Sequence, residues 1–219
     1  MNEIEEKLVQ GIEDLSLHLP GPLQIKLLAT YQLLFLKWNK TINLSAHRES
    51  AVSIEKNFLD CIYLSSLISE KKILDFGSGG GFPGLVLAIL NSKRDLILVE
   101  SDKKKSAFLK TIMRELDLTN VEIIPEHIDV KKPLKILSEK NIEIIVSRAT
   151  ISGEDLMLLG SSLLSKQGRL LLMLSEKQSE EMKVSQNTEY ECEKEISYLL
   201  PWSKIKRKIL IFRKKCMFE

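Results

Sequence analysis

The chain has 219 residues, of which 44% are hydrophobic, and a formal net charge of +2 from 32 basic and 30 acidic side chains. This composition is typical of a soluble globular protein, and the length fits one α/β domain with an extension or at most two small domains. The near-neutral total gives no sign of a nucleic-acid-binding protein, so any such function must depend on how the charges are distributed.

The cysteines and the apolar segments indicate the cellular compartment in which the protein is expected. The chain has an odd number of widely spaced cysteines, Cys61, Cys192 and Cys216, so we expect neither a disulfide framework nor a CxxC metal pair, and a reducing, cytoplasmic setting follows. The polar N-terminus lacks the pattern of a signal peptide, and no apolar run approaches the roughly 18 residues of a membrane span. The histidines lack ligand spacing, so we predict no metal and no membrane partner.

Residues 1–70 are predicted to form an N-terminal helical extension. Two apolar stripes at helical spacing, separated by Pro20-Gly21-Pro22, predict helices that end near Asn39, and a third helix is expected from Ser50 to Ile68. Residues 71–219 form the second predicted unit, and we expect the two units to pack as one compact body.

The most informative segment is Lys71–Gly84, KKILDFGSGGGFPG, where five glycines follow a short apolar run that ends in Asp75. It predicts a buried strand that turns sharply into a helix, because glycine tolerates positive φ and lets a ligand approach the main chain. The N–H groups at the start of the helix are then expected to be open to polar or anionic ligand groups. The segment therefore predicts a nucleotide-like cofactor.

Two kinds of cofactor fit such a turn. Gly79-x-Gly81-x-x-Gly84 matches the dinucleotide fingerprint, which is a weak signal on its own. Asp75 at the strand end argues against NAD, since a pyrophosphate would meet negative charge there, whereas a carboxylate suits the amino group or sulfonium of S-adenosylmethionine (SAM). A plain strand–helix turn of an unrelated α/β protein is the remaining alternative, although one or two glycines would serve it.

From Lys71 onward, predicted strands and helices alternate. Helices are expected at Lys103–Asp117 and Gly153–Leu164, and the strands are Lys72–Phe76, Leu96–Glu100, Val121–Pro125, Ile142–Ser147, Arg169–Leu174 and Ile205–Phe212, with a weaker one near Glu191–Leu199. This order predicts βαβ units in a parallel sheet. The short link between the last two strands predicts a hairpin, so one late strand should be antiparallel. The predicted fold class is α/β: a Rossmann-like, mostly parallel seven-stranded sheet with a C-terminal antiparallel hairpin, as in class I SAM-dependent methyltransferases.

Ligands of open α/β sheets bind beyond the carboxyl ends of the strands, which makes the residues there the candidate site. Glu100, followed by Ser101, ends the second strand and is placed to accept hydrogen bonds from ribose hydroxyls; a solvated loop carboxylate is the alternative. After the third strand, Ile128 is placed to cover an adenine ring and Asp129 to accept from its amino group. A helix N-cap explains Asp129 nearly as well.

The fourth strand ends at Ser147, followed by Arg148, a permanent cation at the mouth of the site. Arg148 is expected to hold a carboxylate or phosphate, or else to form a surface salt bridge. Phe82, which follows the glycines, is placed to pack on the cofactor. A separate basic run, Lys204–Lys215, contains no acidic residue and is explained equally well by phosphate contact and by a solvated edge strand.

Together these residues resemble the RsmG/GidB family, bacterial methyltransferases that modify N7 of a guanine in small-subunit (16S) ribosomal RNA. The combination of WNKxINL, GFPG and SRA is specific to this family. The matching segments cover most of the chain: Leu36–Leu44, Phe58-Leu59-Asp60, Asp75–Gly84, Glu100-Ser101, Lys105 with Phe108-Leu109, Ser147-Arg148-Ala149 and Gly168-Arg169-Leu170.

The resemblance implies SAM as cofactor, bound by Gly77, Phe82, Ile128, Asp129 and Arg148, with Glu100 and Ser101 near its ribose; Asp75 and Gly79 of the turn complete the predicted set. It also implies N-terminal helices beside the cofactor pocket and 16S rRNA or the small ribosomal subunit as partner. N7 carries no proton, so no general base is required, and Ser147 and Arg148 are the candidates for orienting the substrate. A cytoplasmic monomer is expected.

The chain departs from the family pattern at several positions. Asn57 stands where the family has His, Gly80 where it has Ala, and Ile128-Asp129 where it has Ala-Glu. Ser175-Glu176 replaces Lys-Gly, which removes a cation from the expected RNA face and leaves the RNA contacts open. The alternatives are a SAM-dependent methyltransferase of a small molecule, a non-catalytic nucleotide-binding module associated with the ribosome, and, third, an NAD-dependent oxidoreductase.

Overall fold

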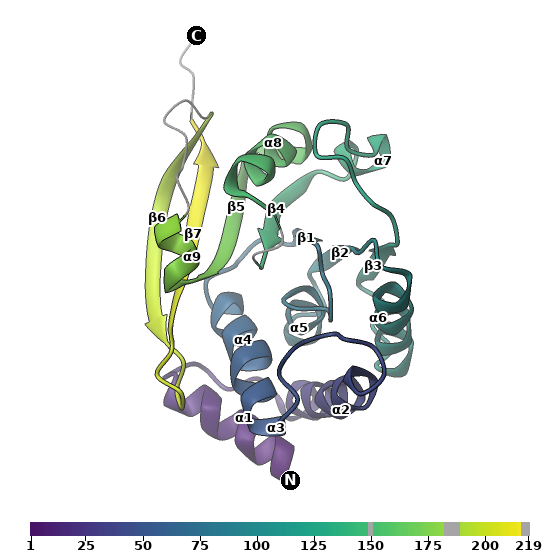
Figure 1. Ribbon diagram of the computed structural model, residues 1–219, viewed down its shortest axis with the longest axis vertical. Helices are drawn as coiled ribbons and strands as arrows, with labels where there is room; N and C mark the ends of the chain where they lie inside the picture. The colour runs from purple at the N-terminus through teal and green to yellow at the C-terminus, as the bar shows by residue number, and fades with distance from the viewer. Residues whose placement is uncertain (149–150, 182–188, 216–219) are drawn as a thin grey trace.

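A computed structural model of the chain describes residues 1–148, 151–181 and 189–215. Its centre is one sheet of seven strands in the order β3-β2-β1-β4-β5-β7-β6 (Figure 1). The strands are β1 (Lys72–Phe76), β2 (Asp95–Val99), β3 (Val121–Ile124), β4 (Ile142–Ser147), β5 (Leu164–Ser175), β6 (Tyr190–Leu199) and β7 (Lys206–Lys214). Ala149, part of the SRA motif, and Cys216 lie outside the described residues.

The predicted parallel sheet with a C-terminal hairpin is confirmed. β7 pairs antiparallel with both β5 and β6, whereas the remaining neighbours pair in parallel. β1 and β4 have the predicted bounds at both ends. β5 begins five residues earlier than predicted, because Leu164 pairs with Ile142 across a register shift that precedes the pairing of Ile144 with Arg169.

Helices cover both faces of the sheet, in unequal numbers (Figure 1). α7 and α8 lie on one face; α4, α5 and α6 lie on the other, where α1 and α2 form a further layer outside them. The bounds are α1 (Glu3–Asp14), α2 (Pro22–Asn39), α3 (Ser50–Ser53), the π-helical η1 (Ile54–Leu59), α4 (Asp60–Ser65), α5 (Gly84–Leu90), α6 (Lys103–Glu115), α7 (Lys135–Ser138), α8 (Gly153–Leu163) and α9 (Glu176–Glu181). The third predicted helix therefore contains a π turn and ends before Ile68.

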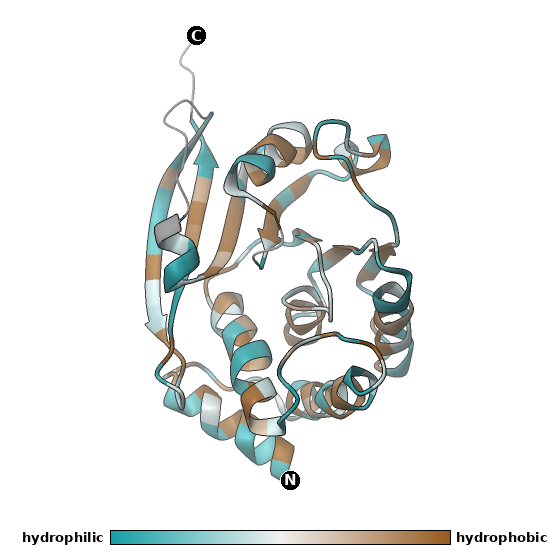
Figure 2. Ribbon diagram, viewed as in Figure 1, coloured by the Kyte–Doolittle hydropathy of each residue, from teal (hydrophilic) through white to brown (hydrophobic). Residues whose placement is uncertain are grey.

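Hydrophobic residues concentrate along β4 and β5, whereas the helices carry both hydrophobic and hydrophilic residues (Figure 2). The larger of two buried clusters joins the N-terminal helices to the sheet. Tyr31 and Phe35 of α2 pack in it with Phe58 of η1, Phe82 of the glycine turn and Phe108 of α6. The N-terminal helices thus share a core with β1, α5 and α6.

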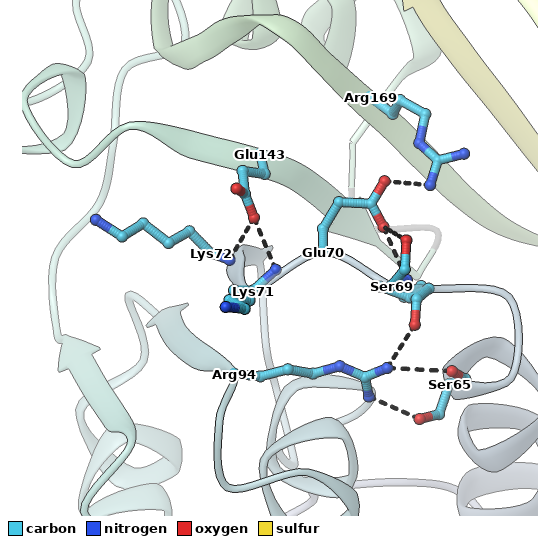
Figure 3. Close-up of polar contacts among 9 residues, drawn as sticks. Ser65, Ser69, Glu70, Lys71, Lys72, Arg94, Glu143 and Arg169 are labelled. Atoms are coloured by element: carbon cyan, nitrogen blue, oxygen red, sulfur yellow. Dashed lines mark hydrogen bonds and ion pairs between the residues drawn. The ribbon is translucent and has the colours of Figure 1, made fainter.

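Polar contacts fasten the helices to the sheet at the amino ends of the strands (Figure 3). The Arg94 guanidinium donates to the Ser65 hydroxyl over 2.7 Å and to the Ile68 carbonyl over 2.6 Å, just beyond α4. The amides of Lys71 and Lys72 donate to Glu143 of β4 over 2.7 and 3.0 Å. These contacts lie at the edge opposite the one where ligands of such sheets bind.

The basic run near the C-terminus lies in β7, an inner strand between β5 and β6, so the edge-strand alternative is wrong. Much of its charge has acidic partners inside the molecule, which weakens the alternative of phosphate contact along the whole run. The pairs are Lys206–Glu176, Arg207–Asp60, Lys208–Glu195 and Arg213–Glu191. Among the described residues, no helix is long and apolar enough to cross a membrane.

Candidate functional site

The glycine turn joins β1 to α5 at the carboxyl edge of the sheet. Gly77 and Gly79 have φ values of +75° and +56°, in the left-handed region that favours glycine. A Cβ added at Gly79 would have only the Gly77 carbonyl oxygen within 4 Å, at 3.9 Å. Glycine is therefore required here by the backbone conformation, and the main chain at Gly79 faces open space, as an approaching ligand requires.

Most amides of this turn are already hydrogen-bonded within the protein. Gly77 and Ser78 donate to the Val99 carbonyl, Gly79 donates to Glu100 Oε2 over 2.7 Å, and Gly84 donates to Asp75 Oδ2 over 2.9 Å. The expectation that these N–H groups are open to an anionic ligand is wrong. Two carboxylates stand where a pyrophosphate would bind, which argues against a dinucleotide.

Asp75 is a buried carboxyl group. It is 0% exposed, and its Oδ1 has no hydrogen-bond partner among the residues that the structure describes. Burial raises the pKa of Asp75 to about 7, against the opposing effects of the Gly84 amide and the Arg148 cation. A buried acceptor without a donor is costly unless a ligand supplies one, so the group is suited to a bound ammonium.

Glu100 joins the two segments that flank the turn. Its Oε2 accepts from Gly79, and its Oε1 accepts from the amide of Asp102, over 2.8 Å, at the start of α6. Each carboxylate oxygen has a second lone pair, so Glu100 retains capacity to accept from ribose hydroxyls. The neighbouring Ser101 is exposed.

A cavity of about 340 Å³ lies between the turn and the residues that follow β2 and β3, within the size range of small-molecule sites. It brings together Gly77, Gly79, Glu100, Ser101 and Ile128 of the predicted set. The remaining lining residues were not predicted: Phe76, Val99, Lys105, Glu126, His127 and Ile151. Proximity in the chain to Glu100 and Ile128 was the available signal for most of them.

The structure places the other predicted residues outside this lining. Asp75 lies buried next to the turn. Asp129 is exposed, and its Oδ1 accepts from the Lys131 amide over 2.9 Å, so it caps a turn, close to the N-cap alternative. Phe82 is buried and stacks on Tyr31 with ring centroids 5.2 Å apart. Ser147 is buried, and its hydroxyl donates to the Phe76 carbonyl over 3.3 Å.

Arg148 stands between the turn and the helical extension. Its guanidinium lies 5.4 Å from the centre of the Phe82 ring and donates to the Lys56 carbonyl and to Asn57 Oδ1, over 3.3 and 3.1 Å. Both acceptors are neutral, so these contacts fix the side chain without offsetting its charge. Asn57, where the family pattern has His, is buried and serves as one of these acceptors. Among the described residues, no group of three His, Cys, Asp or Glu side chains could hold a metal ion.

The chain is similar in sequence to known proteins. The family model described as "GidB: rRNA small subunit methyltransferase G" matches residues 24–210. A protein of Pseudomonas aeruginosa named "Ribosomal RNA small subunit methyltransferase G" is 32% identical over 210 residues, covering 95% of each chain.

Solved structures share the fold at low sequence identity. A predicted O-methyltransferase from Agrobacterium tumefaciens aligns with a TM-score of 0.58 and 18% identity, covering 72% of this chain and 82% of that one. A mutant of MtNAS solved in complex with S-adenosylmethionine aligns with a TM-score of 0.56 and 12% identity, covering 85% of this chain and 73% of that one. These neighbours confirm the predicted fold class.

Proposed function

The chain belongs to the rRNA small subunit methyltransferase G family, and from this premise we propose that it transfers a methyl group from SAM to N7 of a guanine in 16S rRNA. The observation that supports the cofactor most directly is the pair of carboxylates at the glycine turn. Asp75 has a buried oxygen for which the described part of the chain offers no donor, and Glu100 borders the 340 Å³ cavity. Such a turn suits a cationic nucleoside and not a pyrophosphate.

The residues of the turn fit SAM by the chemistry of their donors and acceptors. Asp75 Oδ1 would accept from the ammonium of the methionine moiety, Glu100 from the ribose hydroxyls, and the buried Ile128 would cover the adenine. Gly77 and Gly79 would let the cofactor reach the main chain. SAM, when bound, supplies an electrophilic methyl group on a sulfonium.

The residues of the chain need to supply orientation and not proton transfer. Guanine N7 has a lone pair and no proton, so a general base is not required. Holding the base in line with the methyl group can contribute roughly 7–11 kcal/mol to lowering the barrier. Ser147 and Arg148, at the end of β4, are the residues proposed to orient the substrate, because β4 lies beside β1 and the turn. We also propose that the protein acts as a monomer in the cytoplasm, on rRNA or on the small subunit.

Mapping rRNA modifications tests the proposal. Small subunits and naked 16S rRNA from cells lacking the gene are incubated with the protein and tritiated SAM, and the product is mapped by mass spectrometry. We expect one 7-methylguanosine in 16S rRNA and none with Gly77→Ala, whose φ of +75° strains any side chain. Label found only in small molecules, or SAM binding without transfer to any RNA, would contradict the proposal in favour of the alternatives.

A further inference from the structure

A second cavity, of about 290 Å³, lies at the same carboxyl edge of the sheet, beside β4 and β5. Its lining includes Lys56 of η1, Arg148 after β4 and Arg207 of β7, with Met173 and Leu200 among its apolar parts. None of the described residues that line it is acidic. Three cations from three separate elements thus face one space.

Arg207 is held rigidly on the wall of this cavity. Its Nε donates to Asp60 Oδ1 over 3.1 Å and its Nη2 to Asp60 Oδ2 over 2.7 Å, and the Tyr198 hydroxyl also donates to Asp60. Asp60 is 0% exposed and does not line the cavity, so it fixes the guanidinium from behind while the cation faces the space. A guanidinium fixed in this way loses little entropy on gripping a ligand.

The other cations reinforce the field in the cavity. Arg148 is fixed by neutral acceptors on Lys56 and Asn57, which leave its charge uncompensated by those contacts. His47, also in the lining, has a lowered pKa, first because of burial and then because of the nearby cations Lys56, Arg148 and Arg207.

The cavity is adjacent to the cofactor site. Arg148 lines it and also lies 5.4 Å from the Phe82 ring of the glycine turn, and β4 pairs directly with β1 at Val146 and Asp75. Resting on the proposed function, we propose that this cavity binds a backbone phosphate of the rRNA substrate, held by Arg207, Lys56 and Arg148, next to the nucleotide that is methylated. A phosphodiester oxygen can accept from the guanidinium N–H groups that the contacts with Asp60, Lys56 and Asn57 leave over, and the apolar side chains leave room for a sugar or base edge.

RNA binding by the full chain tests this assignment. Binding of 16S rRNA is measured across salt from about 50 to 200 mM for Lys56→Gln, Arg207→Lys and the control Lys206→Gln. Lys206 neighbours Arg207 in β7, pairs with Glu176 and does not line the cavity. SAM affinity by calorimetry and thermal stability are measured for each variant. Arg207→Lys keeps a cation beside Asp60, and Lys56→Gln changes a half-buried side chain that leaves the Asp60 pair intact.

We expect Lys56→Gln and Arg207→Lys to weaken RNA binding about tenfold, the loss of one charge-assisted contact, with SAM affinity unchanged. The salt slope should fall by about one for Lys56→Gln and stay constant for Lys206→Gln, whose RNA affinity should change less than about twofold. If all three variants bound RNA as tightly as the wild type while the wild type still methylated rRNA, the assignment of the cavity would be overturned and the proposed function would stand. Failure of the wild type to methylate rRNA would instead contradict the proposed function.

Inorganic phosphate distinguishes the source of the anion. Phosphate should bind weakly, and its binding should be lost in Lys56→Gln. It should also displace RNA more strongly than chloride does at the same ionic strength. If phosphate binding depends on Lys56 while RNA binding does not, the cavity serves a free phosphate and the assignment to RNA is overturned.

Discussion

Asp75 is the residue on which the proposed cofactor site depends most. Burial raises its pKa to about 7, so the folded protein holds a proton that the unfolded chain releases near the ordinary pKa of 3.8. This contribution to stability is fully present below pH 3.8 and is lost as the pH rises through about 7. At neutral pH the ionised form of Asp75, which is the form proposed to bind the ligand, therefore lowers the stability of the protein without ligand.

Asp75→Asn tests this strain. The substitution removes the buried charge, so the variant should gain stability relative to the wild type at pH 8, on the order of 1 kcal/mol or more, and much less at pH 5. SAM binding should be lost at both values. Thermal unfolding at the two pH values measures the effect, and an equal difference at both would contradict the assigned cause.

The same carboxyl group predicts that SAM binding depends on pH. An ammonium partner favours the ionised form of Asp75, so affinity should rise as the pH increases from 6 to 8, by at most tenfold per unit below the pKa of about 7. Calorimetry in buffers of different ionisation enthalpy should show a proton released on binding. His127 also lines the cavity, so His127→Gln is the control and should keep the pH dependence.

At the scale of elements, α2 contacts the proposed cofactor site through Tyr31. Its hydroxyl donates to the Gly80 carbonyl of the glycine turn, inside the buried aromatic cluster. Tyr31→Phe should cost about 0.5–1.5 kcal/mol of stability and weaken SAM binding several-fold, because the turn loses its fixed position. Tyr63→Phe is the control, because it removes the hydroxyl of a half-buried tyrosine on α4. Unchanged SAM affinity in Tyr31→Phe would show that the turn holds its shape without α2.

The helical extension and the sheet are proposed to fold as one unit. Removing residues 1–70 would take Tyr31, Phe35 and Phe58 away from Phe82 and expose that face of the core. The fragment 71–219 should lack a cooperative thermal transition by circular dichroism. A folded, cooperative fragment would indicate two independent domains.

Helices and strands were predicted correctly where their bounds depend on their own residues. β1 and β4 were predicted at both ends because each is a short apolar run, and β1 ends at the glycine turn. The early start of β5 depends on pairing between Leu164 and Ile142, and the π turn of η1 depends on packing. Neither has a sequence signal within its own residues.

At the scale of the whole molecule, the position of the cavity could be predicted from the order of the strands, but the ion pairs of β7 could not. Gly77, Glu100 and Ile128 follow parallel strands, so their meeting at one edge could be foreseen. The Arg207–Asp60 pair joins β7 to α4 across 147 residues, and β7 itself is an inner strand, although the basic run was equally consistent with an edge strand. Such long-range partners are set by the assembled fold alone.

Glu100 links the glycine turn to the start of α6. One of its carboxylate oxygens accepts from the Gly79 amide and the other accepts from the Asp102 amide. A ligand that seats against this carboxylate should slow amide hydrogen exchange at both positions together. The two amides thus form a built-in reporter, in which a concerted change signals a filled site and an isolated one signals local fraying.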